Sequence, residues 1–170
     1  AEECYFIAQE DVARCLPAIP GLLKLLSNSD DRARMQAAAA LNAVCSEVIG
    51  IEAVAKAGGA AMACGVLRHA LKDGAGLSED FTAETAEILF KLVGDGGGNG
   101  AYRVAKEYNV LSDVLLAPTS NSSLSVRTRA TCAQVLGVLA VQDAHHSTLM
   151  GKGSQCVRAA QEALSSGVAE

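Results

Sequence analysis

The sequence predicts an all-α protein, folded as a right-handed α-solenoid of about three and a half helical repeats. Three observations predict this fold class. Apolar residues recur at helical spacing along most of the 170 residues, equivalent leucines repeat with a period in the mid-forties, and aromatic residues make up only 4% of the chain. A core built from Ala, Leu, Val and Ile favours closely packed helices over a β-sandwich filled with aromatic rings.

The longest predicted helix, residues 31 to 48, shows the repeat most clearly, because its centre is a run of alanines. Alanine has the highest helix propensity, and its small side chain lets a neighbouring helix approach closely. At 3.6 residues per turn, one face of this helix carries Ala37, Ala40, Leu41, Val44 and Val48. Such a face must be buried against another helix, so we expect the chain to repeat the pattern.

Residues 81 to 93 and 126 to 141 repeat the apolar pattern of this long helix. Equivalent leucines mark the long helices and the helices that precede them, with spacings of 44 to 48 residues. They are Leu41, Leu89 and Leu136 in the long helices, and Leu23, Leu67 and Leu115 before them. A period of this length, with a short, a medium and a long helix in each unit, is typical of three-helix solenoid repeats.

In chain order, residues 1 to 15 have loosely helical apolar spacing and are expected to form an N-terminal capping helix. Pro20 then begins a helix over residues 20 to 27, because proline is tolerated in the first turn. The polar residues 27 to 30 end this helix and supply an N-cap for the long helix that follows.

Glycines separate the helices of the next unit. Gly58-Gly59 ends a short helix over residues 50 to 57, since glycine adopts a left-handed turn without steric cost. A medium helix over residues 60 to 72 follows, and Ser78 and Asp80 are candidate caps for the second long helix.

The third unit is predicted as a short helix over 101 to 108, a medium helix over 110 to 116 and a long helix from residue 126. The predicted apolar face of this long helix is Val126, Ala130, Ala133, Leu136 and Leu139. The whole chain then forms one domain, 1-170, with units at 16-57, 58-108, 109-153 and a partial unit at 154-170. The unfinished unit would leave an apolar edge that continues into a longer chain or docks onto a partner or a second copy.

Three segments resemble the armadillo repeat family, with HEAT repeats as near relatives. IPGLLKLL over residues 19 to 26 looks like the second helix of that family, AAALNAV over 38 to 44 like the middle of its third helix, and AKAGG over 55 to 59 like its glycine hinge. The resemblance covers most of the chain and is best over residues 16 to 71. It implies a helical-repeat scaffold that presents a concave surface to protein partners.

The nuclear-import members of this family use Trp and Asn residues on the third helices to hold an extended basic peptide. The matching positions here are Ala39, Ala43, Glu87, Lys91, Gln134 and Val138. None of them is Trp or Asn, and Asn42 lies one position away, about 100° around the helix. The resemblance therefore does not extend to binding of nuclear-import signals.

The starts of the three long helices are charged in a basic-acidic-basic order. They carry Arg32 and Arg34, then Glu79, Asp80 and Glu84, then Arg127 and Arg129. Solvated helix starts with caps and scattered charges would explain this order. The sharper hypothesis is a striped surface that binds an oppositely patterned protein. The candidate partner-binding residues are Arg32, Arg127, Glu84, Glu87, Lys91 and Gln134.

No catalytic, cofactor or metal site is expected. The glycine-rich loop over 94 to 100 could cradle a phosphate, but it misses the G-x-G-x-x-G spacing and no G-K-[ST] follows. His145 and His146 point about 100° apart on a helix and lack a third ligand at metal-binding spacing. Glu84 and Glu87 could form an acid–base pair, but glutamates one turn apart are ordinary on helix surfaces. No nucleophile has an organised base.

Composition excludes several other classes. A net charge of −5 argues against a broad nucleic-acid surface. Six cysteines without a C-x-x-C pair argue against zinc ribbons and redox motifs, and favour a reducing, cytoplasmic compartment. The most apolar region, residues 43 to 71, is interrupted by charged residues, so no membrane span is expected.

These observations together predict a non-catalytic scaffold or adaptor that binds protein partners in the cytoplasm, alone or within a large assembly. The alternative is a nucleotide-exchange cofactor of Hsp70, since armadillo-type members of that class also use a short array. An enzyme ranks third.

Overall fold

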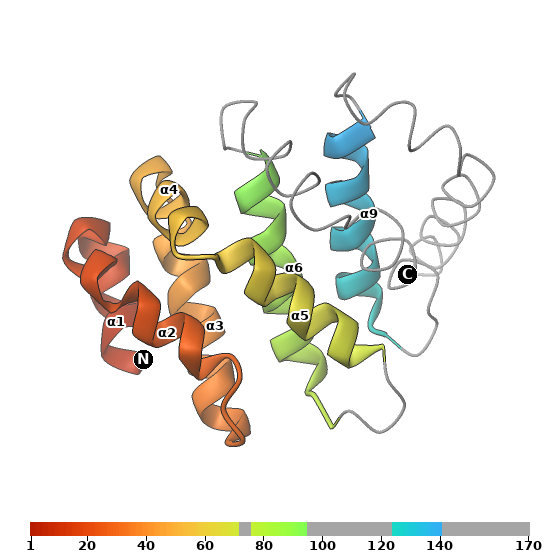
Figure 1. Cartoon of the computed structure of the whole chain (residues 1–170), viewed down its shortest axis with the longest axis horizontal. Coiled ribbons are helices and arrows are strands. Elements are labelled where there is room, and N and C mark those ends of the chain that lie inside the picture. The colour runs from red at the N-terminus through yellow and green to blue at the C-terminus, as the bar shows by residue number, and fades with distance from the viewer. Residues whose placement is uncertain (72–75, 95–123, 141–170) are drawn as a thin grey trace.

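The computed structural model describes residues 1–71, 76–94 and 124–140, which fold into helices (Figure 1). These ranges contain seven α-helices, one 3-10 helix and no strand, which confirms the all-α class. The predicted helices over 101 to 108 and 110 to 116, and the partial unit at 154-170, lie outside the described residues.

The helices differ little from the predicted segments. In chain order they are α1 (Glu2–Glu10), the 3-10 helix η1 (Val12–Ala18), α2 (Ile19–Leu25), α3 (Asp31–Val44), α4 (Val48–Lys56), α5 (Gly59–Ala70), α6 (Glu79–Gly94) and α9 (Val126–Ala140). The predicted N-terminal capping helix is therefore two elements, α1 and η1, joined at Asp11.

The elements pack as two layers of helices. In the first layer α1 contacts α3, α3 contacts α6, and α6 contacts α9, so helices far apart in sequence lie side by side (Figure 1). In the second layer α2 packs on α3 and α5 packs on α6. The short helix α4 contacts η1, α5 and α6. We call the first set the long-helix layer.

The core between the layers is mainly aliphatic, as the composition predicts, and Phe81 is its largest fully buried side chain. Leu41, Leu67 and Leu89 have no exposed surface, Leu23 is 4% exposed and Leu136 is 9% exposed, so all five described positions of the leucine repeat are buried. Burying a leucine side chain contributes roughly 1.5–3 kcal/mol. The repeat spacing therefore identifies residues that hold the two layers together.

Several of the predicted helix ends are confirmed. The Asp30 carboxylate accepts a hydrogen bond from the Arg32 amide (3.2 Å), and Ser78 Oγ accepts one from the Phe81 amide (3.3 Å). Pro20 lies in the first turn of α2. Gly58 has φ +87° between α4 and α5, the left-handed conformation that the glycine pair predicts.

The prediction that the first long helix continues to Val48 is wrong. α3 ends at Val44, and Val48 begins α4 with 62% of its surface exposed. A Cβ on Gly50 would lie 1.9 Å from the Val44 carbonyl oxygen. Only a residue without a Cβ fits against this carbonyl, so Gly50 allows the chain to turn back across the end of α3.

The predicted apolar face of the third long helix is also wrong in part. Val126 is 47% exposed and Ala130 is exposed, whereas α9 buries Thr128, Thr131, Cys132, Val135 and Leu136. The Thr131 hydroxyl donates to the Arg127 carbonyl (3.0 Å), so this threonine is buried with its polar atom bonded to its own helix. A pattern of aliphatic residues alone does not detect such a face.

Candidate functional site

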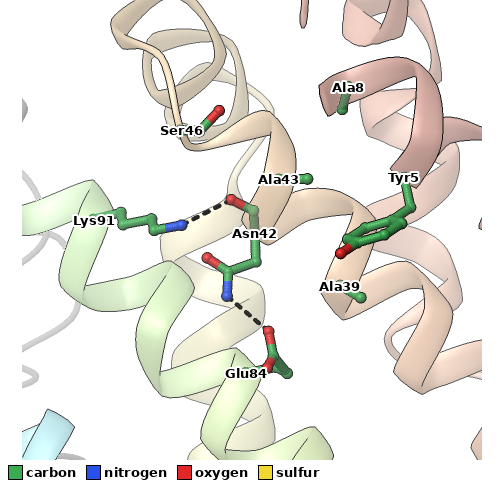
Figure 2. Close-up of a pocket in the computed structure, with 8 residues that line it drawn as sticks. All are labelled: Tyr5, Ala8, Ala39, Asn42, Ala43, Ser46, Glu84 and Lys91. Carbon is green, nitrogen blue, oxygen red and sulfur yellow. Dashed lines mark hydrogen bonds between the residues drawn. The ribbon is translucent and has the colours of Figure 1, made fainter. Parts of the chain in front are cut away.

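A pocket of about 380 Å³ opens between α1, α3 and α6 on the long-helix layer (Figure 2). We call it the long-helix pocket. Ala8, Ala39 and Ala43 lie along it, and their methyl side chains leave its space open. Tyr5 of α1 and Lys91 of α6 lie on opposite sides (Figure 2). The alanine run that lets helices approach closely thus also creates this space.

Asn42 of α3 is buried beside the pocket, with 8% of its surface exposed. Its Nδ2 donates to Glu84 Oε2 (2.7 Å) and to Glu87 Oε2 (2.9 Å), both on α6. Because both acceptors are carboxylates, the NH₂ group must face them, and this fixes the orientation of the amide. Asn42 Oδ1 then lies buried without a hydrogen-bond partner among the described residues.

Arg127 of α9 completes this set of side chains. Its Nη2 donates to Glu84 Oε1 (3.0 Å), and its Nε donates to Glu87 Oε1 (3.0 Å). We call Asn42, Glu84, Glu87 and Arg127 the interhelix network, because it joins the three long helices α3, α6 and α9. The guanidinium fork, with its fixed donors, suits a pair of carboxylates one helical turn apart.

The network also favours the ionised form of Glu87. Partial burial alone would raise the pKa of Glu87, but hydrogen bonds from Asn42 and Arg127 outweigh it, so the pKa lies below its ordinary value. The hydrogen bonds that Arg127 donates to Glu87 and Glu84 raise its own pKa. A lowered pKa suits a charge partner and not a general acid at neutral pH. This geometry does not favour the acid–base interpretation of the glutamate pair.

Lys91 is a separate feature of the pocket. Its Nζ donates to the Asn42 backbone carbonyl oxygen (2.9 Å; Figure 2), and its side chain is half-buried. In the described part of the chain, no carboxylate lies within 4.0 Å of this ammonium group. Lys91 therefore faces the pocket with one hydrogen bond to a neutral group.

The structure brings together four of the six candidate partner-binding residues. Glu84 and Lys91 line the pocket, and Glu87 and Arg127 belong to the interhelix network. Arg32 is exposed at the start of α3, and Gln134 is exposed on α9, outside both groups. In the basic-acidic-basic stripe, Arg127 bonds to the acidic residues of α6, so these charges compensate one another inside the molecule.

Sequence reasoning missed the roles of Asn42 and Tyr5. Asn42 was placed off the peptide-holding position, yet it lies at the pocket and bonds to two glutamates. A polar residue inside an otherwise apolar alanine run was the available signal. Tyr5 gave no signal, because it reaches the pocket from a helix more than 30 residues away in sequence.

A second pocket of about 420 Å³ lies between the α2–α3 connection, α5 and α6. The Arg34 guanidinium lies 5.6 Å from the centre of the Phe81 ring, and donates to the Asn28 carbonyl (3.0 Å) and to Asp31 Oδ1 (2.8 Å). These contacts order the start of α3 against α6.

The other candidate chemistry has little structural support in the described ranges. They contain no group of three or more His, Cys, Asp or Glu residues that could hold a metal ion. His145, His146 and most of the glycine-rich loop lie outside them. No single helix there is long and apolar enough to cross a membrane; α4 and α5 pass this test only as a pair bent by 74°.

The buried thiols behave as small apolar groups. Burial raises the pKa of Cys45 and Cys132 to about 12, and that of Cys64 to about 11. Thiols with such pKa values are largely unreactive, which fits a role in packing.

No protein-family model matches the chain, and neither a curated protein nor a solved structure matches it significantly.

Proposed function

We propose that the chain is a non-catalytic interaction scaffold, built as a right-handed armadillo-like α-solenoid, which holds a segment of a protein partner on its long-helix layer. The observation that carries this proposal is the open pocket on that layer, where α1, α3 and α6 meet. In a repeat array, equivalent helices of successive units present one continuous surface to a ligand.

The packing order supports a solenoid. Each long helix contacts the long helix of the next unit, and α2 and α5 cover the other side of α3 and α6. Each unit thus stabilises its neighbours, as expected of stacked repeats. The buried leucines at positions 41, 89 and 136 give the stack its period.

The side chains at the pocket support binding and not catalysis. Glu84 and Glu87 are both held in hydrogen bonds to Asn42 and Arg127, so neither is placed to transfer a proton. The alanines and Tyr5 offer apolar surface beside a few polar groups, which is the usual composition of a binding site.

The function can be tested by photo-crosslinking. A photoreactive phenylalanine analogue is placed at Ala43, inside the pocket, and in a matched protein at Ala55, on the exposed side of α4. In lysate of the source cells, we expect a discrete crosslinked partner from position 43 and none from position 55. Ala43→Trp should abolish capture of that partner, whereas Ala55→Trp should not.

The partner's identity separates the scaffold from its alternative. A partner that stays bound in the presence of ATP supports the scaffold. An Hsp70 that dissociates when ATP is added would instead indicate a nucleotide-exchange cofactor. Equal crosslinking from both positions, or capture insensitive to Ala43→Trp, would exclude the pocket as the docking site.

A further inference from the structure

We infer that the long-helix pocket anchors an acidic side chain, aspartate or glutamate, of the docked partner segment, with its carboxylate bound by Lys91. This inference rests on the proposed function and specifies the chemistry of the partner. It follows from three properties of the pocket: its unused hydrogen-bonding groups, its charges and its space.

The hydrogen-bonding capacity that remains in the pocket includes the free donors of Lys91, whereas the unpaired acceptor Asn42 Oδ1 is buried from solvent. Both oxygens of Glu84 already accept bonds, from Asn42 and Arg127, and the Asn42 carbonyl accepts one from Lys91. An ammonium group has three N–H donors, and Lys91 uses one of them in the contacts described. Tyr5 and Ser46 also line the pocket, and each of their hydroxyl groups can donate or accept a hydrogen bond. A ligand that uses the free donors of Lys91 must accept hydrogen bonds.

The charges point to an anionic acceptor. The carboxylates of Glu84 and Glu87 share the Arg127 guanidinium. The charge of Lys91 also acts on Glu87, but its ammonium group makes its hydrogen bond to a neutral carbonyl. A half-buried ammonium group interacts more strongly with a carboxylate than a fully solvated one does. Glu84 also lines the pocket and repels an incoming anion. We therefore expect an acidic side chain to bind about tenfold more tightly than its neutral amide, and not several hundredfold.

A basic side chain fits the same pocket less well. It would approach the Lys91 ammonium group, and the oxygens of Glu84 already accept hydrogen bonds from Asn42 and Arg127. The space over Ala39 and Ala43, beside the Tyr5 ring, suits the methylene groups that precede a carboxylate. An acidic side chain therefore satisfies the donors, the ammonium charge and the apolar surface together.

The probe for this inference is a phage-displayed library of random 12-residue peptides, panned against the full chain. We expect the enriched peptides to share an aspartate or glutamate at a fixed position. The affinity of a selected peptide, measured by fluorescence anisotropy, should fall about tenfold when its acid is replaced by the amide. This peptide arm uses only the unmodified protein, so it does not depend on the folding of any variant.

The protein arm uses variants at Lys91. Lys91→Gln should weaken the peptide about tenfold, and the acid-to-amide peptide should lose nothing further against this variant. Lys91→Arg should bind nearly as well as the original. Lys56→Gln is the matched control, because it removes the same charge from an exposed site on α4 outside the pocket, and it should leave affinity unchanged.

The outcomes separate this inference from the proposed function. Peptides that compete for the pocket, as shown by loss of binding in Ala43→Trp, but that lack a shared acid and tolerate Lys91→Gln, would overturn the inference and leave the docking function intact. If no peptide enriches, or if none is affected by Ala43→Trp, both the inference and the proposed function fail.

Discussion

Asn42 is a polar residue on the otherwise apolar buried side of α3, and its hydrogen bonds explain its presence there. Its NH₂ group supplies two donors to Glu84 and Glu87, which would otherwise be two neighbouring carboxylates sharing Arg127 alone. Leaving Asn42 Oδ1 buried and unpaired costs roughly 1–3 kcal/mol. Two hydrogen bonds to ionised groups, each worth about 1.5–3 kcal/mol, offset this cost.

The lowered pKa of Glu87 predicts that stability falls in acid. A carboxylate whose pKa is lower in the folded than in the unfolded chain stabilises the fold fully above the unfolded pKa, and this contribution is lost as the pH falls through the folded pKa. The urea midpoint should therefore drop between pH 5 and pH 3 more steeply in the wild type than in Glu87→Gln. Glu52→Gln, on the exposed side of α4, should keep the wild-type profile. Parallel profiles for Glu87→Gln and the wild type would contradict the network.

A substitution at Leu41 tests the packing of the core. Leu41→Ala removes a fully buried side chain and should lower the free energy of unfolding by about 2–5 kcal/mol. Val48→Ala, at a position 62% exposed, should change it by less than about 0.5 kcal/mol. Urea denaturation measures both, and near-wild-type stability of Leu41→Ala would show that α3 is placed wrongly.

At the scale of the helices, the corner between α4 and α5 depends on backbone conformation. Gly58 has φ +87°, which costs a residue with a Cβ about 1–2 kcal/mol. α5 then starts directly at Gly59 and packs on α6. The corner thus determines the direction in which the second unit leaves the first.

Substitutions at two glycines, Gly58 and Gly65, separate the effect of backbone conformation from that of packing. A Cβ on Gly58 or on Gly65 would meet no other atom within 4 Å, so neither substitution creates a clash. Gly58→Ala should nevertheless destabilise the protein by about 1 kcal/mol, because of its positive φ. Gly65→Ala, inside α5, should stabilise it by about 0.5–1 kcal/mol, because alanine favours a helix. Thermal unfolding measures both, and equal effects would argue against the left-handed corner.

At the scale of the whole molecule, contacts between neighbouring long helices couple the units. Arg127 supplies the ion pairs between α6 and α9 in the described part of the chain. The stability of stacked repeats depends on such nearest-neighbour interfaces. Weakening this interface should therefore release α9 before α3.

Thiol labelling along a urea gradient measures this order. Cys45 follows α3 and Cys132 lies on α9, and burial raises both pKa values to about 12, so alkylation requires opening. In Arg127→Met, Cys132 should react at lower urea than Cys45, as read by mass spectrometry of the alkylated peptides. Arg32→Met, at an exposed site, should shift neither thiol. Equal shifts of both thiols in Arg127→Met would mean that the units open together.

The local spacing of the sequence was sufficient to predict most helices, the caps at Asp30 and Ser78, the glycine corner and the buried leucines of α3, α5 and α6. It failed at Val48 and on the face of α9. These failures have different causes. The end of α3 depends on a contact with Gly50, and α9 buries Thr131, whose hydroxyl bonds to its own helix.

The sequence by itself thus determined the helical class, because helical periodicity and helix ends depend on residues within a few positions of one another. Only the tertiary structure decided that Tyr5, Asn42, Glu84 and Arg127 lie around one region of the long-helix layer. These residues come from four helices, and their approach depends on how side chains of whole helices pack together. The spacing of apolar residues along one helix identifies the face that is buried, but it does not identify which face of which other helix packs against it.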